Sequence, residues 1–187
     1  MARLGLYGGT FDPIHLGHLH LITQVLKANL VDRIILFPAG APQLRSAQPQ
    51  ATSQQRRQMC ELAISDLAKD VADLVEVNPI EILRQGPSYT IDTVEAIKAT
   101  YPIDQLFLII GTDAFAKIDQ WHRIDELRAL TSFIVIARPG TPEFATDQSI
   151  TDIGALDIAS TGIREGSSRE YSPSVAHFIK EHHLYGS

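Results

Sequence analysis

Two histidines three residues apart, His15 and His18, follow a glycine-rich turn near the start of the chain. The turn is Gly8-Gly9-Thr10-Phe11-Asp12-Pro13-Ile14, and it comes directly after an apolar stretch. Adjacent glycines let the backbone approach a ligand without a Cβ in the way, as phosphate-binding turns require. At this spacing the two imidazoles share one face of a helix, where each can donate a hydrogen bond to an anion. The segment is therefore typical of a seat for a polyphosphate.

The last residues of the turn predict where the helix begins. Asp12 fits a helix N-cap and Pro13 the first helical residue, so the N–H groups of the first turn would point into the same space as the glycines. Gly17 keeps the helix surface low between the two imidazoles. A third histidine nearby, His20, is interpreted as a solvated or core residue.

Other chemistries for this segment are less favoured. A His-x-x-His pair can be half of a metal site, but zinc would need further ligands, and the sequence has neither a His-Glu-x-x-His pattern nor a nearby cysteine. No protein-bound metal is therefore expected. The dinucleotide fingerprint G-x-G-x-x-G and the P-loop pattern are also absent, which disfavours a dehydrogenase and a P-loop kinase.

A second candidate seat for phosphate lies near the C-terminus, at Ser160-Thr161-Gly162-Ile163-Arg164. Two hydroxyls at an expected helix start, with a guanidinium one turn further on, suit phosphate oxygens through charge-assisted hydrogen bonds. Considered alone, a Ser-Thr pair before a helix is more often a simple cap.

The hydrophobic pattern predicts the scaffold that must position these residues. Short apolar stretches alternate with segments of helical period, as in a parallel sheet with crossover helices. The expected fold class is α/β, a Rossmann-like open parallel sheet with helices on both faces, in a single domain over residues 1–187. The predicted strands are Leu4–Tyr7, Ile34–Phe37, Leu74–Val77, Leu106–Ile110, Phe133–Ile136 and, on a weaker pattern, Leu156–Ile158.

Apolar residues at spacings of three and four mark one face of each predicted helix. The four sets are Leu19, Ile22, Leu26 and Leu30; Met59, Leu62, Ala63 and Leu67; Ile91, Val94 and Ile97; and Val175, Phe178, Ile179 and His182. The last helix has Ser172 as N-cap and Pro173 as its first residue. The stretches from Ala39 to Ser53 and from Pro139 to Ser149 are predicted loops that either border the ligand crevice or are surface excursions.

The composition of the chain limits which ligands it can bind and in which cellular compartment it is expected. Sixteen Lys and Arg against 22 Asp and Glu give a net charge of -6, which disfavours nucleic acid but still allows a small phosphorylated ligand. The single cysteine, Cys60, can form no internal disulfide and is interpreted as a small buried residue. No apolar run approaches the ~20 residues of a membrane span, and the start of the chain does not fit a signal peptide. A cytoplasmic protein without membrane contact is expected.

The order of motifs closely resembles the nucleotidyltransferase superfamily with an H-x-G-H motif, in its nicotinate-nucleotide adenylyltransferase branch. The turn and helix start carry the resemblance most strongly, and further blocks extend it over nearly the whole chain. These blocks are Pro38-Ala39-Gly40, Gly86-Pro87-Ser88-Tyr89-Thr90-Ile91-Asp92-Thr93, Gly111-Thr112-Asp113, Trp121, Arg138-Pro139-Gly140, Ser160-Thr161-Gly162-Ile163-Arg164 and Phe178 to Tyr185.

The resemblance implies transfer of AMP from ATP to nicotinate mononucleotide, a step of NAD biosynthesis, by a nucleotidyltransferase that uses Mg²⁺ together with ATP. The sequence allows a homo-oligomer but does not determine the oligomeric state. The resemblance implies catalytic roles for His15 and His18, with His18 the better candidate for stabilising the transition state. The implied ATP-binding residues are Gly8, Gly9, Thr10, Phe11, His15, His18, Arg45, Gly111, Asp113, Ser160, Thr161 and Arg164. The implied mononucleotide-binding residues are Tyr89, Thr90 and Trp121.

Two residues outside the H-x-G-H turn could have purely structural roles instead of functional ones. Trp121 is expected to stack on the pyridine ring, and otherwise it is a core residue. Asp113 is expected to bind ribose hydroxyls, and its alternative is a helix N-cap.

The chain departs from the family pattern at two places. Leu44 stands where the family usually has histidine, within Pro42-Gln43-Leu44-Arg45, and Ala159 replaces one hydroxyl of the second seat. These departures motivate one alternative, a nucleotide-binding regulator without turnover. Within the same class, the acceptor could instead be nicotinamide mononucleotide or phosphopantetheine, but the phosphopantetheine branch lacks the Gly-Pro-Ser-Tyr-Thr block and fits poorly. The intact His15, His18 and Arg164 argue against the regulator.

Overall fold

The computed structural model describes residues 2–40, 48–137, 139 and 149–187. Over these residues the chain forms a six-stranded sheet in the order β3-β2-β1-β4-β5-β6, and every neighbouring pair is parallel. The strands are β1 Arg3–Gly9, β2 Arg33–Pro38, β3 Val75–Val77, β4 Gln105–Gly111, β5 Ser132–Ile136 and β6 Ile150–Thr151.

The strand order creates a crevice beside β1. The chain moves outward from β1 to β2 and β3, and then returns to place β4 on the other side of β1. The connections that leave β1 and β4 therefore diverge at the carboxyl ends of these strands, which is where open α/β sheets bind their ligands.

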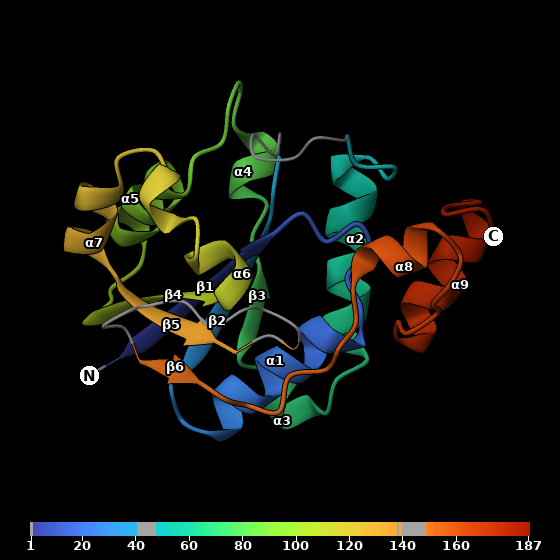
Figure 1. Cartoon of the computed structure of the whole chain (residues 1–187), viewed down its shortest axis with the longest axis horizontal. Coiled ribbons are helices and arrows are strands. Elements are labelled where there is room, and N and C mark those ends of the chain that lie inside the picture. Colours follow the sequence, from blue (N-terminus) through green and yellow to red (C-terminus); the bar gives the residue numbers. More distant parts are fainter. Residues whose placement is uncertain (1, 41–47, 138, 140–148) are drawn as a thin grey trace.

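Helices cover both faces of the sheet, as the sequence predicted (Figure 1). The helices are α1 Leu16–Lys27, α2 Ser53–Ser65, α3 Lys69–Ala72, α4 Ile80–Leu83, α5 Thr90–Thr100, α6 Thr112–Phe115, η1 Ile118–Gln120, α7 Ile124–Leu130, α8 Ser160–Arg164 and α9 Pro173–Glu181. Ile22 of α1 and Met59 of α2 belong to one buried cluster, whereas Ile91 of α5 and Leu127 of α7 belong to a second.

The central strands supply side chains to both clusters because successive residues of a strand point to opposite faces. In β4, Leu108 packs into the cluster of α5 and α7, and Ile109 packs into the cluster of α1 and α2. This explains why the central strands are apolar at consecutive positions.

One sequence prediction about the outer parts of the fold is wrong. Residues Leu156–Ile158 form no strand, and the sixth strand is Ile150–Thr151, which pairs with Val135 and Ile136. Ile158 is buried beside Gly17 instead of in the sheet. The first predicted loop ends at α2, where Thr52 caps the helix by accepting a hydrogen bond from the Gln55 N–H. Residues 41–47 of this loop and 140–148 of the second predicted loop lie outside the described residues. Within the part of the chain that the structure describes, no helix is long and apolar enough to cross a membrane.

Candidate active site

The turn after β1 is held by a buried carboxylate and not by helix capping. Asp12 is 0 % exposed, and its carboxylate accepts hydrogen bonds from the N–H groups of Gln50 (2.9 Å) and Ala51 (3.0 Å) and from the hydroxyl of Tyr185 (2.7 Å). The prediction that Asp12 and Pro13 open the helix is therefore wrong. The Asp12–Pro13 peptide is cis, and α1 begins at Leu16 with His15 as its N-cap residue.

The two imidazoles of the H-x-G-H motif lie together, as predicted. Their rings stack with centroids 3.7 Å apart, and the His15 N–H donates to Nδ1 of His18 at 3.1 Å. Because Nδ1 accepts a hydrogen bond, the proton of the neutral His18 ring belongs on Nε2. His18 thus has a defined donor atom, while its partner His15 is only 2 % exposed.

The glycines of the turn are required first by packing within the protein. A Cβ at Gly8 would lie 2.3 Å from the ring of Phe37, and one at Gly9 would lie 2.8 Å from the ring of Phe11. A Cβ at Gly17 would come within 3.1 Å of the His15 ring. Gly8 and Gly9 nevertheless line a cavity, so their backbone also faces the space where a ligand can bind.

The second candidate seat lies directly against this turn. Arg164 donates from Nη1 to the Asp12 carbonyl at 2.8 Å and from Nη2 to the Thr161 hydroxyl at 2.9 Å. The Ser160 hydroxyl donates to the Pro13 carbonyl at 3.0 Å. The two groups of phosphate-binding candidates, more than 140 residues apart in sequence, are therefore neighbours, and Ser160 is the first residue of a helix as predicted.

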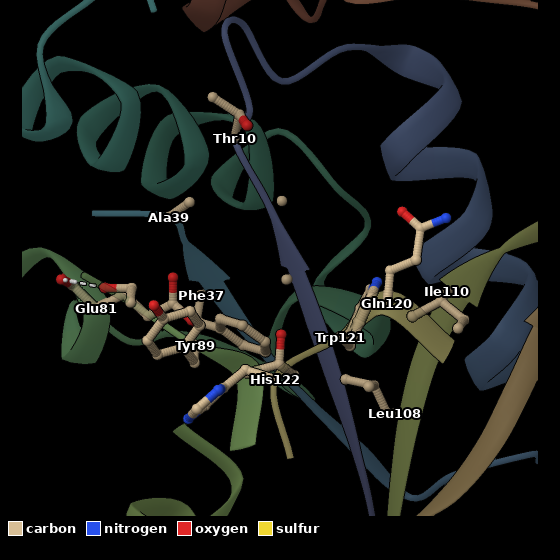
Figure 2. A pocket seen from close by; sticks show the side chains of 14 residues that line it. Thr10, Phe37, Ala39, Glu81, Tyr89, Leu108, Ile110, Gln120, Trp121 and His122 are labelled. Carbon is tan, nitrogen blue, oxygen red and sulfur yellow. Dashed lines mark hydrogen bonds between the residues drawn. The ribbon is translucent and has the colours of Figure 1, made fainter. Parts of the chain in front are cut away.

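A cavity of about 520 Å³ runs from the turn to a wall of aromatic side chains (Figure 2). Thr10 lies at one end, and Tyr89, Trp121 and His122 lie at the other. The residues that line the cavity include Gly8, Gly9, Thr10, Glu81, Tyr89, Thr90, Trp121 and His122. The three residues predicted to bind the mononucleotide thus share one cavity with the glycine turn, whereas His15, His18 and Arg164 are not among the described residues that line it.

Trp121 lies between the cavity and the core. It lines the cavity and also packs, half-buried, against the apolar cluster of α5 and α7. Its neighbour His122 lies against Tyr89, with ring centroids 4.3 Å apart and the ring planes tilted by 33°. All three rings line the cavity, and aromatic side chains suit an aromatic ligand.

The segment that carries Trp121 and His122 is fixed by ion pairs behind it. Arg123 has a left-handed backbone, with φ of 53°, and its guanidinium contacts Glu126 at 2.6 Å, Glu95 at 2.7 Å and Asp92 at 3.6 Å. Hydrogen bonds to Glu126, and to a smaller extent those to Glu95, raise the pKa of Arg123 above its ordinary value. The network joins this segment to α5.

The remaining predicted residues have mixed outcomes. Gly111 ends β4 and is the N-cap residue of α6, so Asp113 lies exposed in the first turn and is not the cap. Phe11 is buried with its ring edge against His18 at 5.0 Å between centroids. Arg45, together with Leu44, lies outside the described residues.

Sequence reasoning missed two charged residues that are buried beside the site, Arg56 and Glu81. A signal for Arg56 was present, because Arg56, Met59, Cys60 and Ala63 follow the spacing of a buried helical face. A cation at such a position indicates a specific buried partner. Glu81 carried no comparable signal, because α4 has only four residues.

Comparison with known proteins assigns the chain to a family. The model of the cytidylyltransferase-like family matches residues 6–166, and the chain belongs to that family of nucleotidyltransferases. It is 38% identical to a protein of Bacillus pumilus called probable nicotinate-nucleotide adenylyltransferase, over all of both chains. It is 36% identical to the nicotinate-nucleotide adenylyltransferase of Bacillus subtilis, also over all of both chains. Within the family, the chain is a member of the nicotinate-nucleotide adenylyltransferase branch.

A solved structure supports the fold over the same length. The Plasmodium falciparum nicotinic acid mononucleotide adenylyltransferase complexed with NaAD superposes with a TM-score of 0.81 at 20% identity, covering 99% of this chain and 98% of the other. The six-stranded α/β architecture is thus that of nucleotidyltransferases.

Proposed function

We propose that the protein transfers AMP from ATP to nicotinate mononucleotide, forming the deamido dinucleotide and pyrophosphate. The observation that carries this proposal is the single cavity that joins the glycine turn to the aromatic wall of Tyr89 and Trp121. The names of full-length relatives support it. The reaction is a step of NAD biosynthesis.

The chemistry requires no base and no covalent intermediate. An oxygen of the mononucleotide 5′-phosphate attacks the α-phosphorus of ATP, and the bond from that phosphorus to the oxygen bridging to the β-phosphorus breaks. The attacking phosphate is already largely a dianion near neutral pH because its second pKa is ~6. The barrier lies in bringing anions together and in the charge that develops on pyrophosphate, so catalysis consists of positioning and electrostatic stabilisation.

The residues of the first seat have matching roles. The His18 Nε2–H is the donor that stabilises charge developing at the reacting phosphate, because the His15 N–H occupies Nδ1. Thr10, which lines the cavity, contacts the triphosphate, and His15 supports His18 from behind. Burial of His15 and its stacking on His18 keep the donor oriented before the substrate arrives.

The second seat holds the leaving group. Arg164 uses two of its N–H groups to bind Asp12 and Thr161, and a guanidinium has five. Its remaining donors are assigned to the β- and γ-phosphate oxygens, together with the Thr161 hydroxyl. The single O–H of Ser160 already donates to the Pro13 carbonyl, so Ser160 supports the position of the seat and does not donate to phosphate.

Magnesium is assigned to the substrate. Among residues 2–40, 48–137, 139 and 149–187, no three His, Cys, Asp or Glu side chains gather to hold a metal ion. We therefore assign Mg²⁺ to the ATP phosphates, whose charge it partly neutralises.

The acceptor's pyridine ring is assigned to the aromatic wall. Trp121 offers an indole face to the cationic ring, a pairing worth ~1 kcal/mol when partly desolvated. Tyr89 and Thr90 are the N-cap and first residue of α5, and the amides of a helix start favour the carboxylate of nicotinate over an uncharged carboxamide.

The test is pyrophosphate release with ATP, Mg²⁺ and one acceptor at a time. Release should be fastest with nicotinate mononucleotide, slower with nicotinamide mononucleotide and absent with phosphopantetheine. Preference for the amide would overturn the assignment of the acceptor. Binding of ATP without release with any acceptor would indicate a regulator.

A further inference from the structure

Gly40 is held from both of its backbone polar groups by buried charged side chains. Its carbonyl accepts a hydrogen bond from Nη2 of Arg56 at 3.3 Å, and its N–H donates to the carboxylate of Glu81. Arg56 is 1 % exposed and Glu81 is 6 % exposed. Gly40 follows β2 by two residues, so this contact lies at the carboxyl edge of the sheet, where the ligand cavity opens.

Each of the two charges also reaches a different end of the site. Nη1 of Arg56 donates to the Thr10 carbonyl at 2.7 Å, in the turn after β1. The Glu81 carboxylate accepts from the Thr93 hydroxyl at 2.9 Å, and Thr93 lies in the first turn of α5, whose start forms the mononucleotide wall. A continuous series of hydrogen bonds thus joins the phosphate end of the cavity to the aromatic end.

This arrangement costs more than a fold alone requires. An apolar side chain in place of a buried charge is often neutral or stabilising when it packs well, and the neighbours of Arg56 on the buried face of α2 are Met59, Cys60 and Ala63. Close approach at Gly40 is equally specific, because a Cβ there would lie 2.2 Å from the Glu81 carbonyl oxygen. Two buried charged side chains of opposite sign therefore meet at one glycine, where no larger residue would fit.

We propose that Arg56 and Glu81 are positioning residues for the transfer reaction, and that they set the separation between the phosphate turn and the mononucleotide wall. This inference rests on the proposed function. Attack in line on the α-phosphorus requires the attacking oxygen of one bound substrate to lie about 3–3.5 Å from the phosphorus of the other, and a displacement of about 1 Å can cost ~100-fold in rate. The two side chains act through Gly40, Thr10 and Thr93 and not by binding either substrate.

The experiment compares steady-state constants of Arg56→Met and Glu81→Gln with those of the wild-type enzyme. Positioning predicts that kcat falls about 10-fold or more in Arg56→Met, with KM for ATP and for nicotinate mononucleotide each changed less than threefold. Glu81→Gln should lower kcat by a smaller factor, because the amide oxygen can still accept one of the two hydrogen bonds. A rise confined to the mononucleotide KM would show that Glu81 binds substrate, and would overturn its positioning role.

The matched control is Arg57→Met, which removes the same charge from the adjacent position of α2. Arg57 pairs with Glu61 on the exposed face at 2.8 Å, so kcat should stay at the wild-type value. Arg56→Lys covers the case in which Arg56→Met does not fold, because a lysine keeps the charge but cannot span both carbonyls as a guanidinium fork does. Restored folding with kcat still reduced is the expected result, and wild-type kcat in Arg56→Lys would overturn the proposal.

A double-mutant cycle supplies a readout that general destabilisation would not give. If both residues act through Gly40, the kcat of the double variant Arg56→Met, Glu81→Gln should be no lower than that of the worse single variant. Independent, multiplicative losses would overturn the inference. Absence of transfer by the wild-type enzyme would overturn the proposed function together with this inference, whereas an active wild type with unaffected Arg56 and Glu81 variants would overturn the inference alone.

Discussion

The two ends of the cavity are built in different ways. At the phosphate end, backbone turns are fixed by buried polar groups, with Asp12 holding three donors and Arg164 holding the Asp12 carbonyl. At the mononucleotide end, the half-buried Tyr89 and Trp121 present their rings, and the ion pairs behind them are partly exposed.

The difference follows the demands of the two ligand groups. Charge that develops on phosphate is stabilised by donors that are already oriented, since reorientation during the reaction would cost energy. A pyridine ring needs only a flat apolar surface, which tolerates small movements. Changes at the phosphate end should therefore act on kcat, and changes at the aromatic end should act on KM for one substrate.

The largest expected effect is at the phosphate end. His18→Ala should lower kcat by ~100-fold or more, because it removes a donor aimed at developing charge. KM for both substrates should change little by comparison. The control is His20→Ala, since His20 is two residues away and its Nε2 lies 3.2 Å from the Ile153 carbonyl oxygen. Unchanged kcat in His18→Ala would remove His18 from the mechanism.

A smaller effect, on binding, is expected at the aromatic end. Trp121→Ala should raise KM for nicotinate mononucleotide about fivefold or more, which corresponds to the loss of a cation–π contact of ~1 kcal/mol. KM for ATP should stay near its wild-type value, and Trp121→Phe should recover part of the loss. Equal increases for both substrates would mean that Trp121 acts through the core cluster that it also contacts.

Tyr185→Phe tests whether the buried contacts of the phosphate end stabilise the fold as well as the site. The variant removes one of three donors to Asp12, so the free energy of unfolding should fall by about 1 kcal/mol. Chemical denaturation measures this, with Tyr171→Phe as the control. An undiminished free energy of unfolding would mean that the hydroxyl contributes nothing to holding the turn.

The smallest effect concerns the pH dependence of stability at the junction of the two ends. Burial is the main cause that raises the pKa of Glu81 in the folded protein. The folded state therefore binds this proton more tightly than the unfolded chain does, and the contribution of Glu81 to stability is lost as pH rises from the ordinary carboxyl range through the raised pKa. Glu81→Gln should lack this loss, so its stability relative to the wild type should improve with pH in denaturation curves. A difference that is constant with pH would contradict the raised pKa.

Local sequence patterns predicted most of the scaffold but not its outer parts. The central strands were predictable because burial on both faces leaves uninterrupted apolar stretches, as in Leu106–Ile110. Strand β6 was not predictable, because it has two residues and one of them is Thr151. The short helices between β3 and β5 are likewise too brief to show a period.

The proximity of His15 and His18 was predictable because the two residues are only three positions apart in sequence. The predicted role of Asp12 as a helix cap was wrong because Asp-Pro satisfies the local rule for a helix start. Its actual role is determined by distant residues, Tyr185 and the backbone of residues 50–51. The burial of Arg56 could be predicted from the spacing of its helix. Its partners Thr10 and Gly40, however, belong to separate elements, which no local pattern contains.

The hydrogen bond between Tyr185 and Asp12 joins positions 173 residues apart. A contact of this separation closes a very long loop and so belongs among the slowest to form as the chain collapses. The phosphate turn should consequently acquire its final shape late in folding, after the sheet beneath it. A bulky group attached to Ser187 would sit two residues from the hydroxyl that secures this turn, and would strain a contact that the chain makes only at the end of its folding.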